Sequence, residues 1–135
     1  MERLVIDTDV MSFYFKNDTR FADYAPALDG KQLVLSFMTL AELYLWQELR
    51  KWGANRRELM MREIRERYIV FPADRNLCQQ WAIIKTETQR MGRVLNTADA
   101  WVAATAVVLS IPLVTHNAKD FNFLPQIKIV TANTQ

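Results

Sequence analysis

The chain has 135 residues, of which 50% are hydrophobic and 24% are charged, which is enough for one domain with a hydrophobic core and too little for two. Its 3 glycines, 4 prolines and 11% aromatic residues exclude a collagen-like, disordered or low-complexity chain. The formal net charge of +2 does not by itself indicate a polyanion-binding protein. We therefore expect a single domain spanning residues 1–135.

Short apolar runs alternate with stretches of helical periodicity from one end of the chain to the other. In chain order we expect a strand at Leu4–Ile6, helices at Val10–Lys16 and Phe21–Leu28, a strand at Gln32–Leu35, helices at Thr39–Lys51 and Asn55–Glu66, a strand at Tyr68–Phe71, helices at Arg75–Met91 and Asn96–Leu109, and strands at Leu113–Thr115 and Ile127–Val130. Gly53 and Gly92 are expected to end two of these helices. The alternation predicts an α/β fold in which a mostly parallel central sheet carries helices on both faces.

Cysteine usage and the distribution of apolar residues predict a cytoplasmic protein without a membrane segment. Cys78 is the single cysteine, which excludes an internal disulfide and a cysteine-based metal knuckle. The N-terminus runs directly into an apolar strand and shows no signal-peptide pattern. The most apolar stretch, Trp101–Val114, is shorter than the ~20 residues that span a bilayer and contains Pro112.

Acidic and amide side chains follow several of the predicted strands. Asp7 follows the first strand, Glu42 lies about one turn beyond the second, and Asn117 and Asp120 follow Leu113–Thr115. Asp99 opens a helix and follows no strand, so we infer its position at the same edge from packing. Because the carboxyl ends of parallel strands meet at one edge, where ligands bind, we expect these side chains to converge.

Each of these residues, taken singly, also fits an ordinary helix cap. Thr39–Glu42 satisfies the capping-box pattern, and Asn96–Asp99 and Asn117–Asp120 resemble it. An acid in a first helical turn gains roughly 0.3–1 kcal/mol from the helix dipole, which is enough to explain any one of them. Capping does not explain why all of these residues are expected at the same edge of the sheet.

Carboxylates that converge in a cleft repel one another unless a cation neutralises them. Oxygen ligands without cysteine, and with one histidine in the chain, favour Mg²⁺ or Mn²⁺ over Zn²⁺. Such ions activate a bound water and neutralise the charge that develops on a phosphate. The expected substrate is therefore a phosphate ester.

With these residues in place, the sequence resembles the PIN-domain ribonucleases, and most closely the VapC toxins of type II toxin–antitoxin pairs. The resemblance rests on four motifs in the family's order, which are Ile6–Val10, Thr39–Leu43, Asp99–Ala104 and Val114–Phe121. The resemblance as a whole covers essentially the whole chain. The resemblance implies a PIN-like three-layer sandwich.

The resemblance also implies roles for individual residues. The implied ligands of Mg²⁺ or Mn²⁺ are Asp7, Glu42 and Asp99, and either Asn117 or Asp120 would complete the acidic catalytic pocket. A metal-bound water would then attack an RNA phosphodiester and leave a 5′-phosphate and a 3′-hydroxyl. Thr8 and Thr115 would hold the carboxylates by hydrogen bonds.

Two positions depart from the family's pattern. Asp9 replaces the usual Asn, and Asn117 stands where many PIN nucleases have a fourth Asp. Asp9 either turns towards the site and adds charge there, or caps the first helix, which we favour because Asp and Asn both cap well. Asn117 weakens the two-metal version of the mechanism more than it weakens the nuclease assignment.

Residues 50–67 form a basic segment with seven cations and three acids, a net charge of +4 in a chain whose total is +2. Such a segment fits RNA phosphates, but pairs of Glu58 with Arg62 and of Glu63 with Arg67 at i,i+4 fit a solvated helix equally well. In the family, the same helices form a groove for the antitoxin. The residues expected to contact RNA or antitoxin are Arg50, Lys51, Arg56, Arg57 and Arg62, with Trp46 and Trp52 beside them.

We interpret the remaining aromatic landmarks structurally. Trp81 and Trp101 are expected in the core or in a dimer contact, and the lone His116 is expected to be a structural hydrogen-bonding residue rather than a catalytic base.

Two other functions fit parts of the sequence. Asp7-Thr8-Asp9 mimics the nucleophile motif of haloacid-dehalogenase-like phosphatases, but Met11 stands where Thr or Val is expected and the late Asp-Asp pair is absent. Acids that serve only as caps would leave a catalytically silent PIN-like binding module, which the near-complete acid set argues against. We expect a homodimeric Mg²⁺- or Mn²⁺-dependent endoribonuclease toxin that cleaves RNA, with tRNA as a candidate, and is neutralised by a cognate VapB-type antitoxin.

Overall fold

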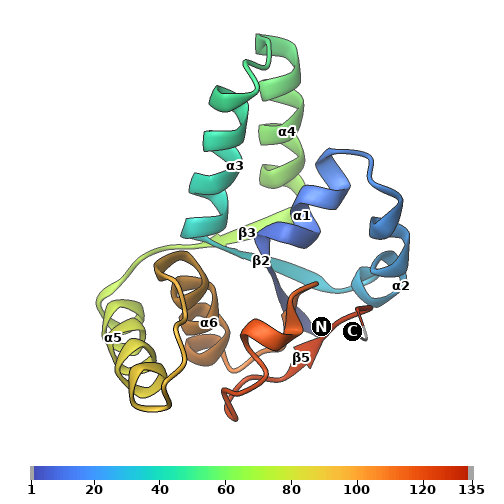
Figure 1. Ribbon diagram of the computed structural model, residues 1–135. Helices are drawn as coiled ribbons and strands as arrows, with labels where there is room; N and C mark the ends of the chain where they lie inside the picture. Colours follow the sequence, from blue (N-terminus) through green and yellow to red (C-terminus); the bar gives the residue numbers. More distant parts are fainter. Residues whose placement is uncertain (1, 134–135) are drawn as a thin grey trace.

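A computed structural model describes residues 2–133 and places a parallel five-stranded sheet at their centre (Figure 1). The strands are β1 (Arg3–Ile6), β2 (Gln32–Ser36), β3 (Tyr68–Phe71), β4 (Leu113–Val114) and β5 (Ile129–Val130), and their order in the sheet is β3-β2-β1-β4-β5. Every described pairing is parallel. The expected α/β architecture is confirmed, with helical layers on both faces of the sheet.

The two helical layers bury two separate hydrophobic cores against the sheet. The helices are α1 (Thr8–Phe15), the 3-10 helix η1 (Thr19–Asp23), α2 (Ala25–Leu28), α3 (Phe37–Leu49), α4 (Ala54–Arg67), α5 (Arg75–Arg90), α6 (Thr97–Leu109) and the 3-10 helix η2 (Ala118–Asp120). Alternate strand residues face opposite sides, so Val5 packs with α5 and α6 while its neighbour Ile6 packs with α1 and α4. Both cores hold the sheet rigid beneath its edge.

The register of the central strands determines which residues meet at the carboxyl edge. Val5 of β1 pairs with both Val34 and Leu113, and Ile6 pairs with Val114. The residues that follow β1, β2 and β4 therefore emerge at one edge, as the acid motifs predicted.

The predicted boundaries need two main corrections. The helix expected at Phe21–Leu28 is two short helices, because Pro26 lies in the first turn of α2, where its missing N–H leaves no hydrogen bond unmade. Gly53 does not end α3; Lys51 adopts the left-handed conformation (φ 53°) after it, and Gly53 is the N-cap of α4. Gly92, with φ 70°, does follow the end of α5 as expected.

Helices α3 and α4 form a hairpin that projects beyond the sheet (Figure 1). Arg57 fastens its turn, because its guanidinium donates to the backbone oxygens of Trp52 and Gln47 and to the carboxylate of Glu48. Within the described part of the chain, none of the helices has the length and apolar character needed to cross a membrane.

Candidate active site

Asp7 lies at the centre of the carboxyl edge and is only 5% exposed. It caps α1, since its Oδ1 accepts the backbone N–H of Thr8 at 2.8 Å, and its Oδ2 accepts the hydroxyl of Thr115 at 2.8 Å. Burial, followed by the neighbouring charge of Asp9, raises the pKa of Asp7 well above its ordinary value. The first strand thus delivers a buried carboxylate held from two directions.

Glu42 is hydrogen-bonded to Thr8, which lies at the start of α1, just after β1. The Thr8 hydroxyl donates to Glu42 Oε1 at 2.8 Å and lies 2.9 Å from the hydroxyl of Thr39. Because the single Thr8 proton is used on Glu42, Thr39 must be the donor in the second bond. Thr8 therefore connects the acid of α3 to the start of α1.

The capping-box interpretation of Thr39 and Glu42 is wrong. Helix α3 begins two residues earlier than Thr39, at Phe37, and its N-cap is Ser36, whose hydroxyl accepts the backbone N–H of Met38 at 3.1 Å. Thr39 is fully buried inside the helix. With no backbone donor to cap, the carboxylate of Glu42 is available for the site.

Asp99 joins the same edge from α6. Asn96 caps that helix as expected, accepting the backbone N–H of Asp99 at 2.7 Å. Partial burial and the charges of Asp120, Glu42 and Asp9, in that order, raise the pKa of Asp99 from 3.8 to about 6. The acids whose charges act on Asp99 come from three other elements, which agrees with its expected place at this edge.

Asp9 is not the N-cap of α1, which is Asp7, so the capping role that we favoured for it is only partly right: it accepts one backbone N–H of the first turn. Its Oδ1 accepts the N–H of Val10 at 2.7 Å, and its Oδ2 accepts the N–H of His116 at 2.9 Å and the side-chain amide of Asn117 at 3.2 Å. Burial raises its pKa. Asn117 likewise makes no capping bond to η2, so the resemblance of Asn117–Asp120 to a capping box is also misleading.

The acids have oxygen-ligand chemistry but no cationic partner within the described chain. None of the ion pairs found among residues 2–133 includes Asp7, Asp9, Glu42, Asp99 or Asp120. Nor are any three His, Cys, Asp or Glu side chains in this part of the chain arranged to hold a metal ion as they stand. The donor set fits Mg²⁺ or Mn²⁺ in kind, because Mg²⁺ binds through few carboxylates and keeps several of its waters.

His116 has the structural environment that we expected for it. Its Nδ1 lies 2.6 Å from the hydroxyl of the buried Tyr24, and its ring packs edge-on against Phe13 at 5.1 Å between centroids. Trp81 and Trp101 stack on each other at 4.9 Å and pack against the α5–α6 core, as one of our two alternatives for them predicted.

The basic segment is only partly as predicted. The expected pair of Glu63 with Arg67 forms at 3.0 Å, but Glu58 pairs with Arg65 at 2.8 Å rather than with Arg62. Arg57 is occupied in the hairpin turn and is not an available cation. The remaining candidates, Arg50, Lys51, Arg56 and Arg62, are exposed.

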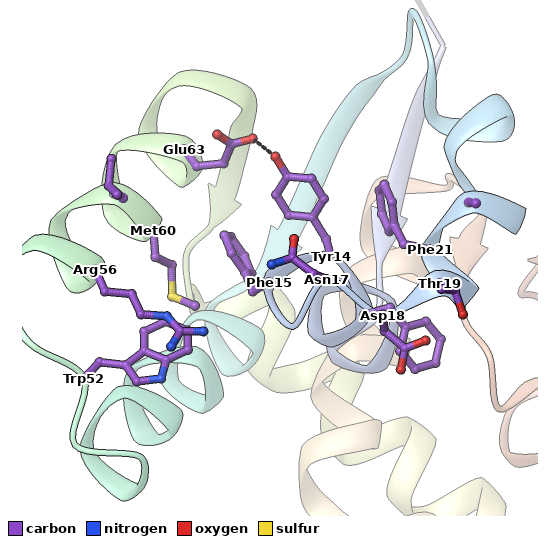
Figure 2. A pocket seen from close by; sticks show the side chains of 13 residues that line it. Tyr14, Phe15, Asn17, Asp18, Thr19, Phe21, Trp52, Arg56, Met60 and Glu63 are labelled. Carbon is purple, nitrogen blue, oxygen red and sulfur yellow. Dashed lines mark hydrogen bonds between the residues drawn. The ribbon is translucent and has the colours of Figure 1, made fainter.

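A groove of about 760 Å³ between α1 and α4 was missed by the sequence analysis. Figure 2 shows Tyr14 and Phe21 on one side and Trp52, Arg56 and Met60 on the other, with the 2.6 Å bond from the Tyr14 hydroxyl to Glu63 crossing between them. The guanidinium of Arg56 lies 3.9 Å from the Trp52 ring centroid. The aromatic run Phe13–Phe15 was the available signal.

Comparison with known families decides between the fold-level alternatives. The family model for the PIN domain matches residues 4–124. The chain belongs to the PIN domain family. Membership confirms the resemblance inferred from the four motifs and excludes the haloacid-dehalogenase alternative for this PIN domain.

Relatives of this PIN domain include bacterial and archaeal proteins named Ribonuclease VapC1. The protein from Haemophilus influenzae strain R2866 is 28% identical over 122 residues, which cover 87% of this chain and 88% of that protein. The protein from Methanocaldococcus jannaschii is 24% identical over 124 residues, which cover 92% and 82% respectively.

Solved structures share the fold over nearly the whole chain. A VapBC2 complex from Rickettsia felis bound to a promoter DNA fragment matches with a TM-score of 0.83 and 18% identity, covering 96% of this chain and 98% of that one. A DNA-bound VapBC from Salmonella typhimurium matches with a TM-score of 0.79 and 26% identity, covering 97% and 98%.

Proposed function

We propose that this PIN domain is a Mg²⁺- or Mn²⁺-dependent endoribonuclease, the toxin of a VapBC pair. The observation that carries the proposal is the convergence of carboxylates at one sheet edge, from the residue after β1 and from α3 and α6, where none of the ion pairs among residues 2–133 involves them. The VapC1 ribonuclease relatives supply the reaction class.

The residues that would hold the metal are Asp7, Glu42 and Asp99, with Asp120 or the amide oxygen of Asn117 as the fourth oxygen donor. A bound divalent ion would activate water and neutralise the charge on the reacting phosphate. Thr115 and Thr8 position their carboxylates through the hydrogen bonds of 2.8 Å described above. The rigid strands beneath them keep these bonds in register.

The exposed cations of the hairpin would bind the phosphates of RNA, which would cross the open edge beside them. The candidates are Arg50, Lys51, Arg56 and Arg62. A tRNA is a suitable first substrate, since its loops offer the unpaired strands that proteins recognise most readily. The proposed location is the cytoplasm, and the proposed assembly is a homodimer.

The proposed partner is a VapB-type antitoxin, and the groove between α1 and α4 is its proposed docking surface. The matching structures of Rickettsia felis and Salmonella typhimurium are VapBC assemblies. The groove offers aromatic walls for apolar side chains. Its carboxylates, Glu63 and Asp18, already pair with Arg67 and Arg20 within the chain. The apolar face of an amphipathic antitoxin helix has the complementary chemistry.

Cleavage of a tRNA pool by the purified chain tests the catalytic proposal. We expect cleavage with Mg²⁺ or Mn²⁺, none with EDTA, and a loss of at least about 100-fold in Asp7→Asn and Glu42→Gln. Asp29→Asn is the matched control, because it removes one exposed carboxylate that precedes β2 at the opposite edge. Both site variants should remain folded, with a thermal melting midpoint that can still be measured.

Full activity in both site variants would refute the carboxylate mechanism. Absence of cleavage in every preparation, with antitoxin binding retained, would instead favour a silent PIN-like binding module.

A further inference from the structure

The two positions that depart from the family's motifs, Asp9 and Asn117, lie against each other. The Asn117 side-chain nitrogen donates to Asp9 Oδ2 at 3.2 Å across 108 residues of sequence. The same oxygen accepts the backbone N–H of His116 at 2.9 Å, and the other oxygen accepts Val10 at 2.7 Å. Three N–H donors thus converge on one carboxylate and fix its orientation; the two backbone donors also act against the rise in pKa that burial causes.

These bonds dictate which end of the Asn117 amide remains available. An ionised carboxylate only accepts hydrogen bonds, so the Asn117 amide must present its NH₂ to Asp9. Its carbonyl oxygen, the end that can bind a cation, therefore lies on the side away from Asp9.

The pair is also connected to Asp7. The backbone N–H of Asn117 donates to the Thr115 hydroxyl at 3.1 Å, and that hydroxyl donates to Asp7 Oδ2 at 2.8 Å. Asp9 is the largest neighbouring charge acting on Asp7, and it also acts on Asp99. The charge of Asp9 therefore acts on two of the proposed metal ligands, and the segment 115–117 links Asp9 to Asp7 through hydrogen bonds.

We propose that Asp9 and Asn117 act as one carboxylate–amide pair, in which Asp9 adds a negative charge to the metal pocket and holds the Asn117 carbonyl oxygen towards a bound cation. This inference rests on the proposed metal-dependent function. Asp9 is a positioning residue that also contributes charge; Asn117 is the oxygen donor.

The pair makes an unusual prediction about charge. Asn117→Asp adds an acid to the pocket, yet it replaces the amide donor of this 3.2 Å contact by a second carboxylate, which repels Asp9. We therefore expect it to lower the metal-free melting midpoint. Adding Asp9→Asn restores one carboxylate and one amide, and should recover most of that loss.

Mn²⁺ binding to the RNA-free protein, measured by titration calorimetry, tests the pair directly. Relative to the unsubstituted chain, Asp9→Asn should weaken Mn²⁺ binding by at least about tenfold, because a charge next to a divalent ion is lost. The double variant Asp9→Asn with Asn117→Asp should return to within about threefold, because the charge is restored across the same contact. Asp29→Asn is the control for net charge, and melting in EDTA verifies that each variant folds.

Three results would overturn the inference: unchanged Mn²⁺ affinity in Asp9→Asn, no recovery in the double variant, or a metal-free melting midpoint that Asn117→Asp leaves unchanged. These failures differ from that of the proposed function. If the unsubstituted chain binds no Mn²⁺, the metal-dependent function and this inference both fail. If it binds Mn²⁺ and Asp9→Asn binds it equally well, only the inference fails.

Discussion

Asp99→Asn should stabilise the metal-free protein at neutral pH, although it removes a residue of the proposed site. The pKa of Asp99 is raised from 3.8 to about 6, first by burial and then by the charges of Asp120, Glu42 and Asp9. A raised pKa means that the folded state resists ionisation of this carboxyl. The contribution of Asp99 to stability is therefore least favourable at pH values where its carboxyl is ionised in both the folded and the unfolded state.

The magnitude follows from the shift. About two pKa units correspond to ~3 kcal/mol, but Asp99 is only half-buried, so solvent screening reduces this figure. The variant also gives up the favourable position of a negative charge in the first turn of α6, roughly 0.3–1 kcal/mol. We expect a net gain of about 1 kcal/mol at pH 8, or roughly 3–6 °C in melting midpoint for a chain of this size.

The dependence on pH shows where the substitution stabilises the protein. At pH 8 the unsubstituted chain carries the full penalty, because both its folded and unfolded states are ionised there. The penalty shrinks as pH falls below about 6 and is lost once the pH is below the unfolded value of 3.8. Urea unfolding in EDTA at pH 8, 6 and 4 should show the advantage of Asp99→Asn decreasing in that order.

Two results would refute this reasoning. One is an Asp99→Asn protein that is no more stable than the unsubstituted chain at pH 8, and the other is an advantage that grows towards pH 4. Asp29→Asn should show neither the gain nor the pH trend. Saturating Mn²⁺ should reverse the order of stability, because the cation binds the unsubstituted pocket more tightly.

Three further substitutions test single contacts. Thr8→Val should cost about 1–2 kcal/mol in urea unfolding, because Glu42 and Thr39 both lose their bond to this hydroxyl, whereas Thr8→Ser should retain stability and activity. Arg57→Ala should lower the melting midpoint by an amount that corresponds to about 1–2 kcal/mol, and Arg57→Lys should not rescue it, since one ammonium cannot match the three acceptors of the hairpin turn. Leu59→Glu, at an exposed position of the groove wall, should weaken antitoxin binding at least tenfold in a pull-down titration while leaving RNA cleavage intact; equal affinity would exclude the groove as the docking surface.

The sequence predicted the sheet and the edge at which the acids meet, because both follow from local patterns. Apolar runs alternating with helical periodicity specify a parallel sheet, and parallel strands present their carboxyl ends together. Asp99 follows no strand, and its position was inferred only from packing; the charges of Asp120 and Glu42, which raise its pKa, agree with that inference.

Local patterns were insufficient where two caps competed or where the partner was distant in sequence. Ser36 and Thr39 are both good N-cap residues, and only the length of β2 decides that Ser36 is used. Asp9 is a residue type that caps helices well, but its partners His116 and Asn117 lie about a hundred residues away in the sequence. They come close to Asp9 only because β1 pairs with β4. No local pattern encodes such a contact.

The groove between α1 and α4 and the acidic edge lie at opposite ends of the same short helix, α1. Thr8 and Asp9 begin α1 in the site, whereas Tyr14 and Phe15 end it in the groove. An open edge suits a polymeric substrate, since a strand must pass across the reacting phosphate and cannot be enclosed as a small molecule is.

The groove, with its apolar walls and the Tyr14–Glu63 bond across it, suits a folded segment of protein. Because α1 contributes to both surfaces, a partner bound in the groove would contact the helix whose first turn orders Asp7 and Glu42.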